Sequence, residues 1–284
     1  MTDLDDTLGL TLRRGRNADG GWGYYAGKRS RLEATCWALL ALKDADPQVL
    51  RNWPVRDGLL LEQVDGGPNY AFHALAMLVL GARQVEHATG NQALLDGIQR
   101  VKGVKLPPSE INRQDNSIQG WSWIADTFSW VEPTAWCLLA LKKSRQKAGS
   151  VINTQRIADA EALLIDRCCT GGGWNYGNAN MLGKELEPYV PTTAIALLSL
   201  KDRATEPAFV RSRDYLNRDA GSEKSSVALS LALIALRQLE QPGDGVVSEL
   251  RQQLDTTVAT GNQFAMALAF YALRAGQDDG AFRI

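Results

Sequence analysis

One short pattern occurs three times along this 284-residue chain: a Gly-Trp turn, a gap, and then a helix rich in alanine and leucine. The three copies span residues 19–42, 119–141 and 172–200. A repeat of this length is a supersecondary unit that cannot bury its apolar face alone, so successive copies must pack against one another. The pattern therefore constrains the architecture more than any other feature.

Helical periodicity dominates the chain as a whole. Six segments are apolar on almost every face, as expected of helices buried on all sides: residues 33–43, 69–81, 132–142, 191–201, 223–237 and 262–274. Amphipathic segments alternate with them at residues 3–14, 55–63, 92–101, 155–168, 207–218 and 246–254. Six repeats of outer helix, turn and inner helix predict an all-α (α/α)6 toroid, a single domain over residues 1–284. An open α-solenoid of stacked hairpins is the competing architecture.

The Gly-Trp turns resemble the QW-type repeats of the terpenoid cyclase and protein prenyltransferase superfamily. The best matches are residues 19–23 and 171–175; residues 119–121 form a shortened copy, and residues 63–67 a copy without tryptophan. With the helix pattern, the resemblance covers nearly the whole chain and implies a squalene-hopene-cyclase-like barrel. Squalene-type cyclases of the family use two barrels, whereas this chain is long enough for one.

Charge and composition exclude several classes of function. The formal net charge is -1 and basic residues are scattered, so nothing indicates a nucleic-acid-binding surface. The apolar runs are shorter than the ~20 residues that span a bilayer, and the acidic N-terminus does not resemble a signal peptide. Four cysteines do not make a disulfide framework, so the predicted location is cytoplasmic.

Two glutamates are the most credible candidate acids. Glu33 and Glu132 occupy equivalent positions at the starts of predicted inner helices, each followed two residues later by a threonine. Inner-helix N-termini point into the barrel mouth, where acids from different hairpins can converge. Positive helix ends favour the ionised carboxylate, whereas desolvation favours the protonated form. The alternative is a repeated helix-start device in which both carboxylates bond backbone N–H groups.

Asp126 is the third candidate catalytic residue. It lies in a segment that also contains Trp121, Trp123 and Trp130. An acid among aromatic rings suits carbocation chemistry, because ring faces stabilise positive charge and exclude water. The alternative is a loop packed by its own aromatic residues, with Asp126 as a turn residue.

Further aromatic residues are expected to line the ligand site. Those that follow the glycine-rich turns are predicted to rim the barrel mouth: Tyr24, Tyr25, Trp174, Tyr176 and Tyr189. Tyr70 and His73, which lie one turn apart on the second predicted inner helix, are also expected to contact the ligand. For His73 the competing interpretation is a hydrogen-bonded core residue.

Two short sequence segments match motifs of the family, but both lie on predicted outer helices, whereas the family has these motifs at the starts of inner helices. Asp3-Leu4-Asp5-Asp6-Thr7 matches the string with which proton-initiated cyclases of the family protonate an alkene or epoxide. Here it begins an outer helix, which Asp3 is expected to cap. Asp166-Arg167-Cys168 resembles the Asp-x-Cys pair that helps hold zinc in protein prenyltransferases, but it ends an outer helix. No cofactor or metal ion is therefore expected.

Resemblance and candidate residues together predict an isoprenoid or other apolar ligand in the barrel. If the chain is an enzyme, Asp126, Glu132 or Glu33 would start a cyclisation or isomerisation without metal, as in a class II terpene cyclase-like isomerase. Two alternatives stay open: a non-catalytic binding or scaffold toroid, and a carbohydrate-active toroid with paired carboxylates. Peripheral membrane contact and a partner subunit also stay open.

Overall fold

The computed structural model describes residues 3–108, 113–274 and 280–284, apart from the side chains of residues 3–5. In these ranges, twelve α-helices alternate along the chain between an outer and an inner layer. The inner helices are α2 (Leu32–Ala41), α4 (Tyr70–Ala82), α6 (Val131–Arg145), α8 (Val190–Ser199), α10 (Ser226–Gln238) and α12 (Gln263–Arg274). The outer helices are α1 (Asp3–Arg14), α3 (Gln48–Arg51), α5 (Asn91–Arg100), α7 (Thr154–Asp166), α9 (Pro207–Asp219) and α11 (Asp244–Thr260).

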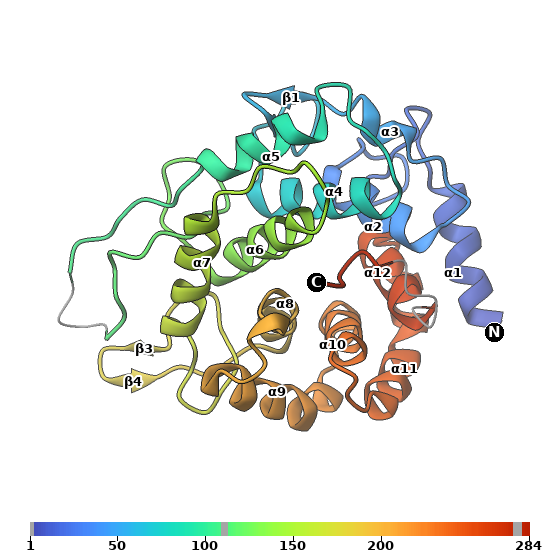
Figure 1. Ribbon diagram of the computed structural model, residues 1–284. Helices are drawn as coiled ribbons and strands as arrows, with labels where there is room; N and C mark the ends of the chain where they lie inside the picture. The colour runs from blue at the N-terminus through green and yellow to red at the C-terminus, as the bar shows by residue number, and fades with distance from the viewer. Residues whose placement is uncertain (1–2, 109–112, 275–279) are drawn as a thin grey trace.

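The inner helices form a closed ring. Each contacts the inner helix before and after it, and α12 packs against α2, as Figure 1 shows. An open solenoid would leave those two helices apart, so the (α/α)6 toroid is confirmed. None of the described helices is long and apolar enough to cross a bilayer.

The Gly-Trp turns are hydrogen-bonded staples between helices. In each, the tryptophan backbone N–H donates to a threonine Oγ1 on the next inner helix: Trp22 to Thr35 at 3.0 Å, Trp121 to Thr134 at 2.9 Å and Trp174 to Thr193 at 2.9 Å. Their indole N–H groups donate to carbonyls of the preceding outer helices, at Leu12, Ile98 and Leu164. At Gly120 a Cβ atom would lie 2.3 Å from Thr134 Oγ1, so the staple needs glycine there.

The second hairpin makes the same connection with different residues. His73 occupies the position of the threonine, and its Nδ1 accepts the Leu60 N–H at 3.0 Å. Its Nε2 lies 3.2 Å from the Leu94 carbonyl oxygen on α5 and therefore donates to it. One buried imidazole thus replaces both the threonine and the indole of the other staples.

The predicted outer helix over residues 55–63 is wrong. This segment contains a short antiparallel hairpin of β1 (Val55–Arg56) and β2 (Leu59–Leu60), in which Val55 pairs with Leu60. The turn residues Asp57 and Gly58 both have positive φ, 54° and 78°, as a type I′ turn requires. The outer position is taken instead by the four-residue helix α3.

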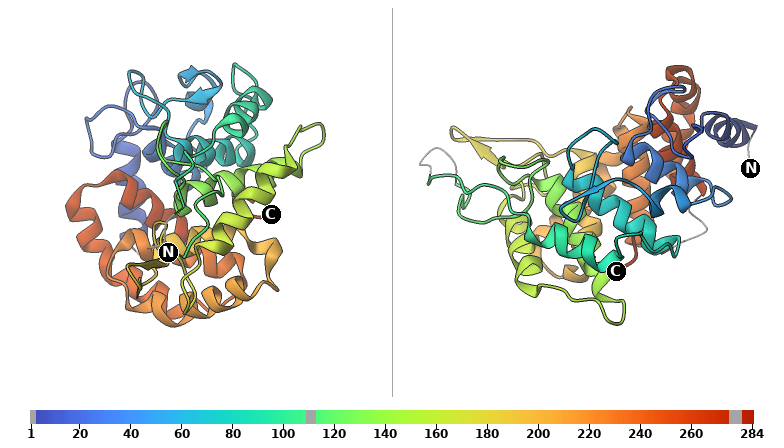
Figure 2. Two further views of the ribbon diagram at one scale, coloured as in Figure 1. Left: turned by 90° about the vertical axis from the view of Figure 1, so that its left-hand side faces the viewer. Right: turned by 90° about the horizontal axis from the view of Figure 1, so that it is seen from above.

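A second hairpin and two 3-10 turns complete the described secondary structure. The strands β3 (Asn180–Met181) and β4 (Lys184–Glu185) pair antiparallel in the connection between α7 and α8. The 3-10 turns η1 (Lys201–Arg203) and η2 (Ala220–Ser222) flank α9. The β3–β4 hairpin and the connection between α5 and α6 project from the same side of the ring (Figures 1 and 2).

The C-terminal segment packs inside the ring. Phe282 is 1% exposed, and its ring lies 5.8 Å from Trp37 on α2, 6.0 Å from Trp136 on α6 and 5.8 Å from Tyr271 on α12, between ring centroids. Figure 1 shows the chain end among the inner helices. We call Phe282, Trp37, Trp136 and Tyr271 the aromatic plug. They fill the bore of the ring below the first turn of the inner helices.

The staple geometry predicts the effect of Thr134→Val. This variant removes the oxygen that accepts the buried Trp121 N–H, so we expect the free energy of unfolding to fall by about 1–3 kcal/mol. Chemical denaturation measures this loss. Thr134→Ser keeps the hydroxyl and should retain more stability, and Thr205→Val, at an exposed turn, should be neutral. Equal stability of the Val and Ser variants would contradict the staple.

Candidate functional site

Glu33 and Glu132 face the axis of the barrel. Each is the second residue of its inner helix, and Trp37 and Trp136 follow four residues later on the same helix face. The two tryptophan rings meet with centroids 6.2 Å apart, although α2 and α6 belong to different hairpins. The two carboxyl groups, one turn above these rings, therefore lie in the same mouth.

The mouth is open to solvent at the layer of the two glutamates and closed one turn below it. The second residue is partly exposed in five of the six inner helices: Glu33, Glu132, Pro191, Val227 and Phe264. One turn deeper, Trp37 and Trp136 are only 1% and 5% exposed. The aromatic plug is thus the buried floor beneath the partly exposed layer of the two glutamates, and the other partly exposed inner-helix residues of that layer are apolar.

Tyr24 connects the first Gly-Trp turn to the acid pair. Its hydroxyl donates to Glu33 Oε2 at 2.6 Å, and its ring meets Phe264 edge-on with centroids 6.3 Å apart. The Arg31 guanidinium lies 5.4 Å from the centre of the Tyr24 ring and is itself paired with Glu62. Tyr24 therefore orients one carboxyl oxygen of Glu33 and leaves the rest of the group to a ligand.

The pKa values of both carboxyl groups are raised above the usual value for glutamate. Burial raises the pKa of Glu33 to about 7, against the hydrogen bond from Tyr24, and the charges of Glu132 and Glu62 raise it further. Burial also raises the pKa of Glu132 to about 7, against a hydrogen bond with the Trp136 indole. Near neutral pH the mouth therefore contains both protonated and ionised carboxyl groups.

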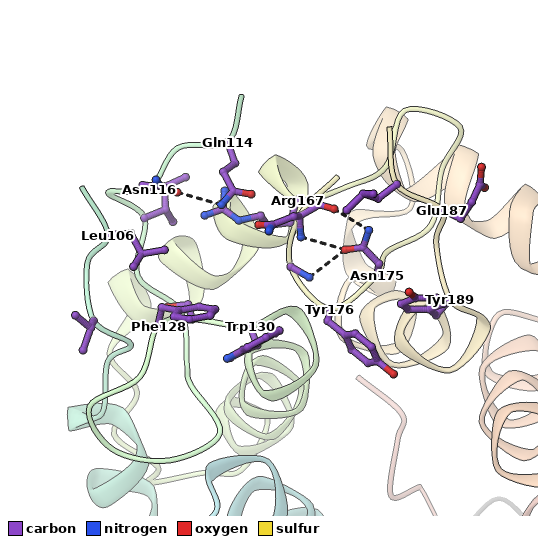
Figure 3. Close-up of a pocket in the computed structure, with 16 residues that line it drawn as sticks. Leu106, Gln114, Asn116, Phe128, Trp130, Arg167, Asn175, Tyr176, Glu187 and Tyr189 are labelled. Atoms are coloured by element: carbon purple, nitrogen blue, oxygen red, sulfur yellow. Dashed lines mark hydrogen bonds between the residues drawn. The ribbon is translucent and has the colours of Figure 1, made fainter. Parts of the chain in front are cut away.

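A second hollow, which we call the rim pocket, lies beside the mouth between the two projecting connections (Figure 3). It encloses about 310 Å³. Two aromatic pairs line it: Phe128 stacks on Trp130 with centroids 4.8 Å apart, and Tyr176 meets Tyr189 at 4.9 Å. Its other lining residues are Val104, Leu106, Gln114, Asn116, Ile118, Ser129, Arg167, Asn175, Gly177, Asn178, Leu186 and Glu187.

The predicted site residues divide between these two places and the packing of the ring. Glu33 and Glu132 lie in the mouth, whereas Trp130, Tyr176 and Tyr189 line the rim pocket. Asp126 does not line the rim pocket: it is exposed, at a turn with φ of 59°, and its charge helps to raise the pKa of Tyr70 at the start of α4. That conformation is the one expected of a turn residue.

Other predicted ligand contacts are parts of the ring's packing. Trp121, Trp174 and His73 have no exposed surface, and Tyr70 is 5% exposed. Trp123 is partly buried and meets Phe72 edge-on, with centroids 6.3 Å apart. Tyr25 is exposed at the first turn, outside the rim pocket. Apart from Trp123 and Tyr25, these residues therefore have little or no surface that a ligand could contact.

The two motif-like strings contribute no described group to the mouth. Asp166 accepts the backbone N–H of Asp115, and Cys168 Sγ lies 3.5 Å from Ser212 Oγ. Among the described residues, no cluster of three or more His, Cys, Asp or Glu side chains could hold a metal ion. The helix α1 begins at Asp3, but the side chain of Asp3, and so its predicted capping role, lies outside the described residues.

Sequence analysis missed the floor of the mouth. Trp37, Trp136, Tyr271 and Phe282 were not among the expected ligand residues, although a signal for two of them exists. The pattern Glu-x-Thr-x-Trp occurs at residues 33–37 and again at residues 132–136. Helix geometry places Glu and Trp on one face and Thr on the opposite face, so the pattern predicts an acid above an aromatic ring.

Comparison with known proteins shows the fold. No protein family model and no curated protein sequence matches the chain. The type II terpene cyclase MstE from Scytonema superposes with a TM-score of 0.61 at 13% identity, covering 98% of both chains. A glycosidase gives 0.61 at 11% identity, covering 99% of this chain and 97% of its own. A family 76 glycoside hydrolase from a bovine Bacteroides thetaiotaomicron strain gives 0.59 at 12% identity, covering 98% and 78%. These neighbours are α/α toroid proteins.

Replacing Glu33 should stabilise the fold at high pH. A carboxyl group whose pKa rises on folding destabilises the fold when it ionises, so the penalty is absent below about pH 4.5 and complete above about pH 7. We expect Glu33→Gln to increase the free energy of unfolding by about 1–3 kcal/mol at pH 8 and by little at pH 4.5. Denaturation across this range measures the difference. A constant difference at all pH values would contradict the raised pKa.

His73 should have the opposite pH dependence. Burial lowers its pKa from 6.5 to about 4, and the Leu60 N–H needs an unprotonated Nδ1. Its contribution to stability is therefore complete above about pH 6.5 and falls as the pH drops towards 4. We expect the stability difference between wild type and His73→Gln to shrink over that interval by about 2–3 kcal/mol. An unchanged difference would show that His73 does not titrate with folding.

Proposed function

We propose that the barrel mouth is an acid-base site that acts on an apolar, isoprenoid-like substrate and starts its isomerisation or cyclisation. The observation that carries this proposal is the pair formed by Glu33 and Glu132, two carboxyl groups of pKa about 7 that lie one helical turn above an aromatic floor. An acid with its pKa near the working pH is available in both of the protonation states that such a reaction uses.

The pKa also restricts the group that receives the proton. A carboxyl group of pKa about 7 is a weak acid, so it transfers a proton more readily to an oxygen atom than to an isolated carbon–carbon double bond. An isoprenoid that carries an epoxide or a comparable oxygen function therefore fits the mouth better than a plain hydrocarbon.

The two carboxyl groups can take complementary roles. Tyr24 donates a hydrogen bond to Glu33 and the Trp136 indole donates one to Glu132, and each bond favours the ionised form of its carboxyl group. Repulsion between the two charges favours a state in which the pair holds one proton. The protonated carboxyl group of the pair would protonate the substrate oxygen, and the ionised one would remove a proton from carbon at the end, so that the isomerisation is balanced.

The aromatic residues suit the intermediate that such a reaction forms. Trp37, Trp136 and Phe264 line the mouth or its floor, and aromatic ring faces stabilise a cation while excluding water. The neighbour MstE is a type II terpene cyclase, and its similarity to this chain lends the proposal support at the level of the fold.

The same carboxyl pair supports a second candidate, cleavage of a glycosidic bond. That reaction also uses two facing carboxyl groups, one protonated and one ionised. The glycosidases among the structural neighbours share the toroid. The two candidates differ in substrate, and one assay series separates them.

The assay compares terminal epoxides of farnesyl and squalene length with nitrophenyl glycosides, using mass spectrometry for products. We expect the epoxides to be isomerised, and Glu132→Gln to lower the rate by about 10²–10⁴-fold. Glu33→Gln should also lower the rate, whereas Asp255→Asn on the exposed face of α11 should not. Full activity of the double variant Glu33→Gln/Glu132→Gln would refute the site, and loss in Asp126→Asn alone would transfer the acid role to Asp126.

A further inference from the structure

The rim pocket is a built site that the proposed reaction does not use. Its first wall is the described part of the connection between α5 and α6, which Arg156 on α7 holds at Val101 and at Gln119. The Arg156 guanidinium is stacked 3.8 Å from the centre of the Trp121 ring and donates to the carbonyls of Val101 at 2.8 Å and Gln119 at 2.9 Å. Because Arg156 is 1% exposed, these bonds are protected from water.

The same wall is attached again near its middle. Arg167, directly after α7, donates to the Asp115 carbonyl at 3.1 Å, and the carboxylate of Asp166 accepts the Asp115 N–H at 3.1 Å. Helix α7 and Arg167 after it therefore hold the wall at Val101, Asp115 and Gln119.

The opposite wall is the connection between α7 and α8. Asn175 is 5% exposed, and its Oδ1 accepts the N–H groups of Gly177 and Asn178, both at 3.0 Å. The Tyr176 carbonyl accepts the N–H of Val131 at the start of α6, at 3.0 Å. This second wall is thus attached to the inner ring at the helix that carries Glu132.

Aromatic surface remains uncovered in the pocket. Phe128, Tyr176 and Tyr189 are 39%, 52% and 45% exposed, and Trp130 is partly exposed. Figure 3 shows Phe128, Trp130, Tyr176 and Tyr189 along one side of the hollow, with Gln114, Asn116 and Arg167 across from them. A ligand with a flat apolar face would cover these rings.

The polar groups of the pocket select against an anionic ligand. Arg167 is already paired with Asp166 and bonded to the Asp115 carbonyl, so it offers little free charge to a phosphate. Glu187 adds a carboxylate, and the remaining polar side chains include the neutral amides of Gln114, Asn116 and Asn178. Gln114 Oε1 has no hydrogen-bond partner among the described residues.

We propose that the rim pocket binds a neutral saccharide. A sugar ring combines an apolar C–H face, which packs on aromatic rings, with hydroxyl groups that bond to amides and carboxylates. An enclosed volume of about 310 Å³ lies at the small end of the range for small-molecule sites. The inference does not depend on catalysis by Glu33 or Glu132, because it rests on different residues and its test measures binding.

The test is saturation-transfer NMR on the full chain with xylobiose, mannobiose and maltose as probes and farnesol as the apolar comparison. We expect at least one disaccharide to bind saturably, with Kd on the order of 0.1–5 mM. The same titration followed by tryptophan fluorescence should respond, because Trp130 lines the pocket.

Variants locate the binding. Tyr176→Ala should weaken saccharide binding at least about tenfold, which corresponds to about 1.4 kcal/mol, and Phe128→Ala provides a second test at another exposed ring. Tyr25→Ala is the matched control, because Tyr25 is as exposed as these residues but lies outside the pocket. The acid double variant Glu33→Gln/Glu132→Gln should still bind the saccharide, which separates this inference from the proposed reaction.

Three results would overturn the inference. The first is the absence of saturable binding by any of the three disaccharides. The second is saccharide binding that neither Tyr176→Ala nor Phe128→Ala weakens. The third is binding of farnesol alone with the same dependence on Tyr176, which would make the hollow an apolar site.

Discussion

The hydrogen bond from a tryptophan backbone N–H to a threonine Oγ1 is the interaction on which the rest of this structure depends. It recurs at Thr35, Thr134 and Thr193, and it fixes the rotation of the inner helices α2, α6 and α8 about their own axes. Once the threonine faces the turn, the residues two before and two after it face the bore. In α2 and α6 these residues are a glutamate and a tryptophan, so the staple also builds the mouth.

The two carboxyl groups of the mouth lower the stability of the fold when they ionise. Burial favours the protonated form of Glu33 and Glu132, and ionising either group at neutral pH works against folding. The ring tolerates this cost because its inner helices bury most of their other residues; in α2 every residue except Glu33 is buried. Groups that oppose stability in this way are often functional, which is why the carboxyl pair, rather than exposed Asp126, carries the proposal.

Much of the fold could be predicted from the sequence, and the reasons for the failures are physical. The repeated turns and all-round apolar helices predicted a ring, and Glu33 and Glu132 were placed correctly at helix starts. Residues 55–63 were misassigned because local turn chemistry at Asp57 and Gly58 overrides an amphipathic pattern. Phe282 in the bore and the two walls of the rim pocket depend on contacts between segments far apart in sequence, for which periodicity carries no signal.

The central claim is that two carboxyl groups in the barrel mouth hold protons near neutral pH. The most direct measurement is a carbon-13 NMR titration of the glutamate side-chain carboxyl groups, with Glu33→Gln and Glu132→Gln used to assign the two signals. The account predicts that both signals titrate near pH 7, and that removal of either group lowers the apparent pKa of the other. Titration of both signals near pH 4.5, independently of each other, would contradict it.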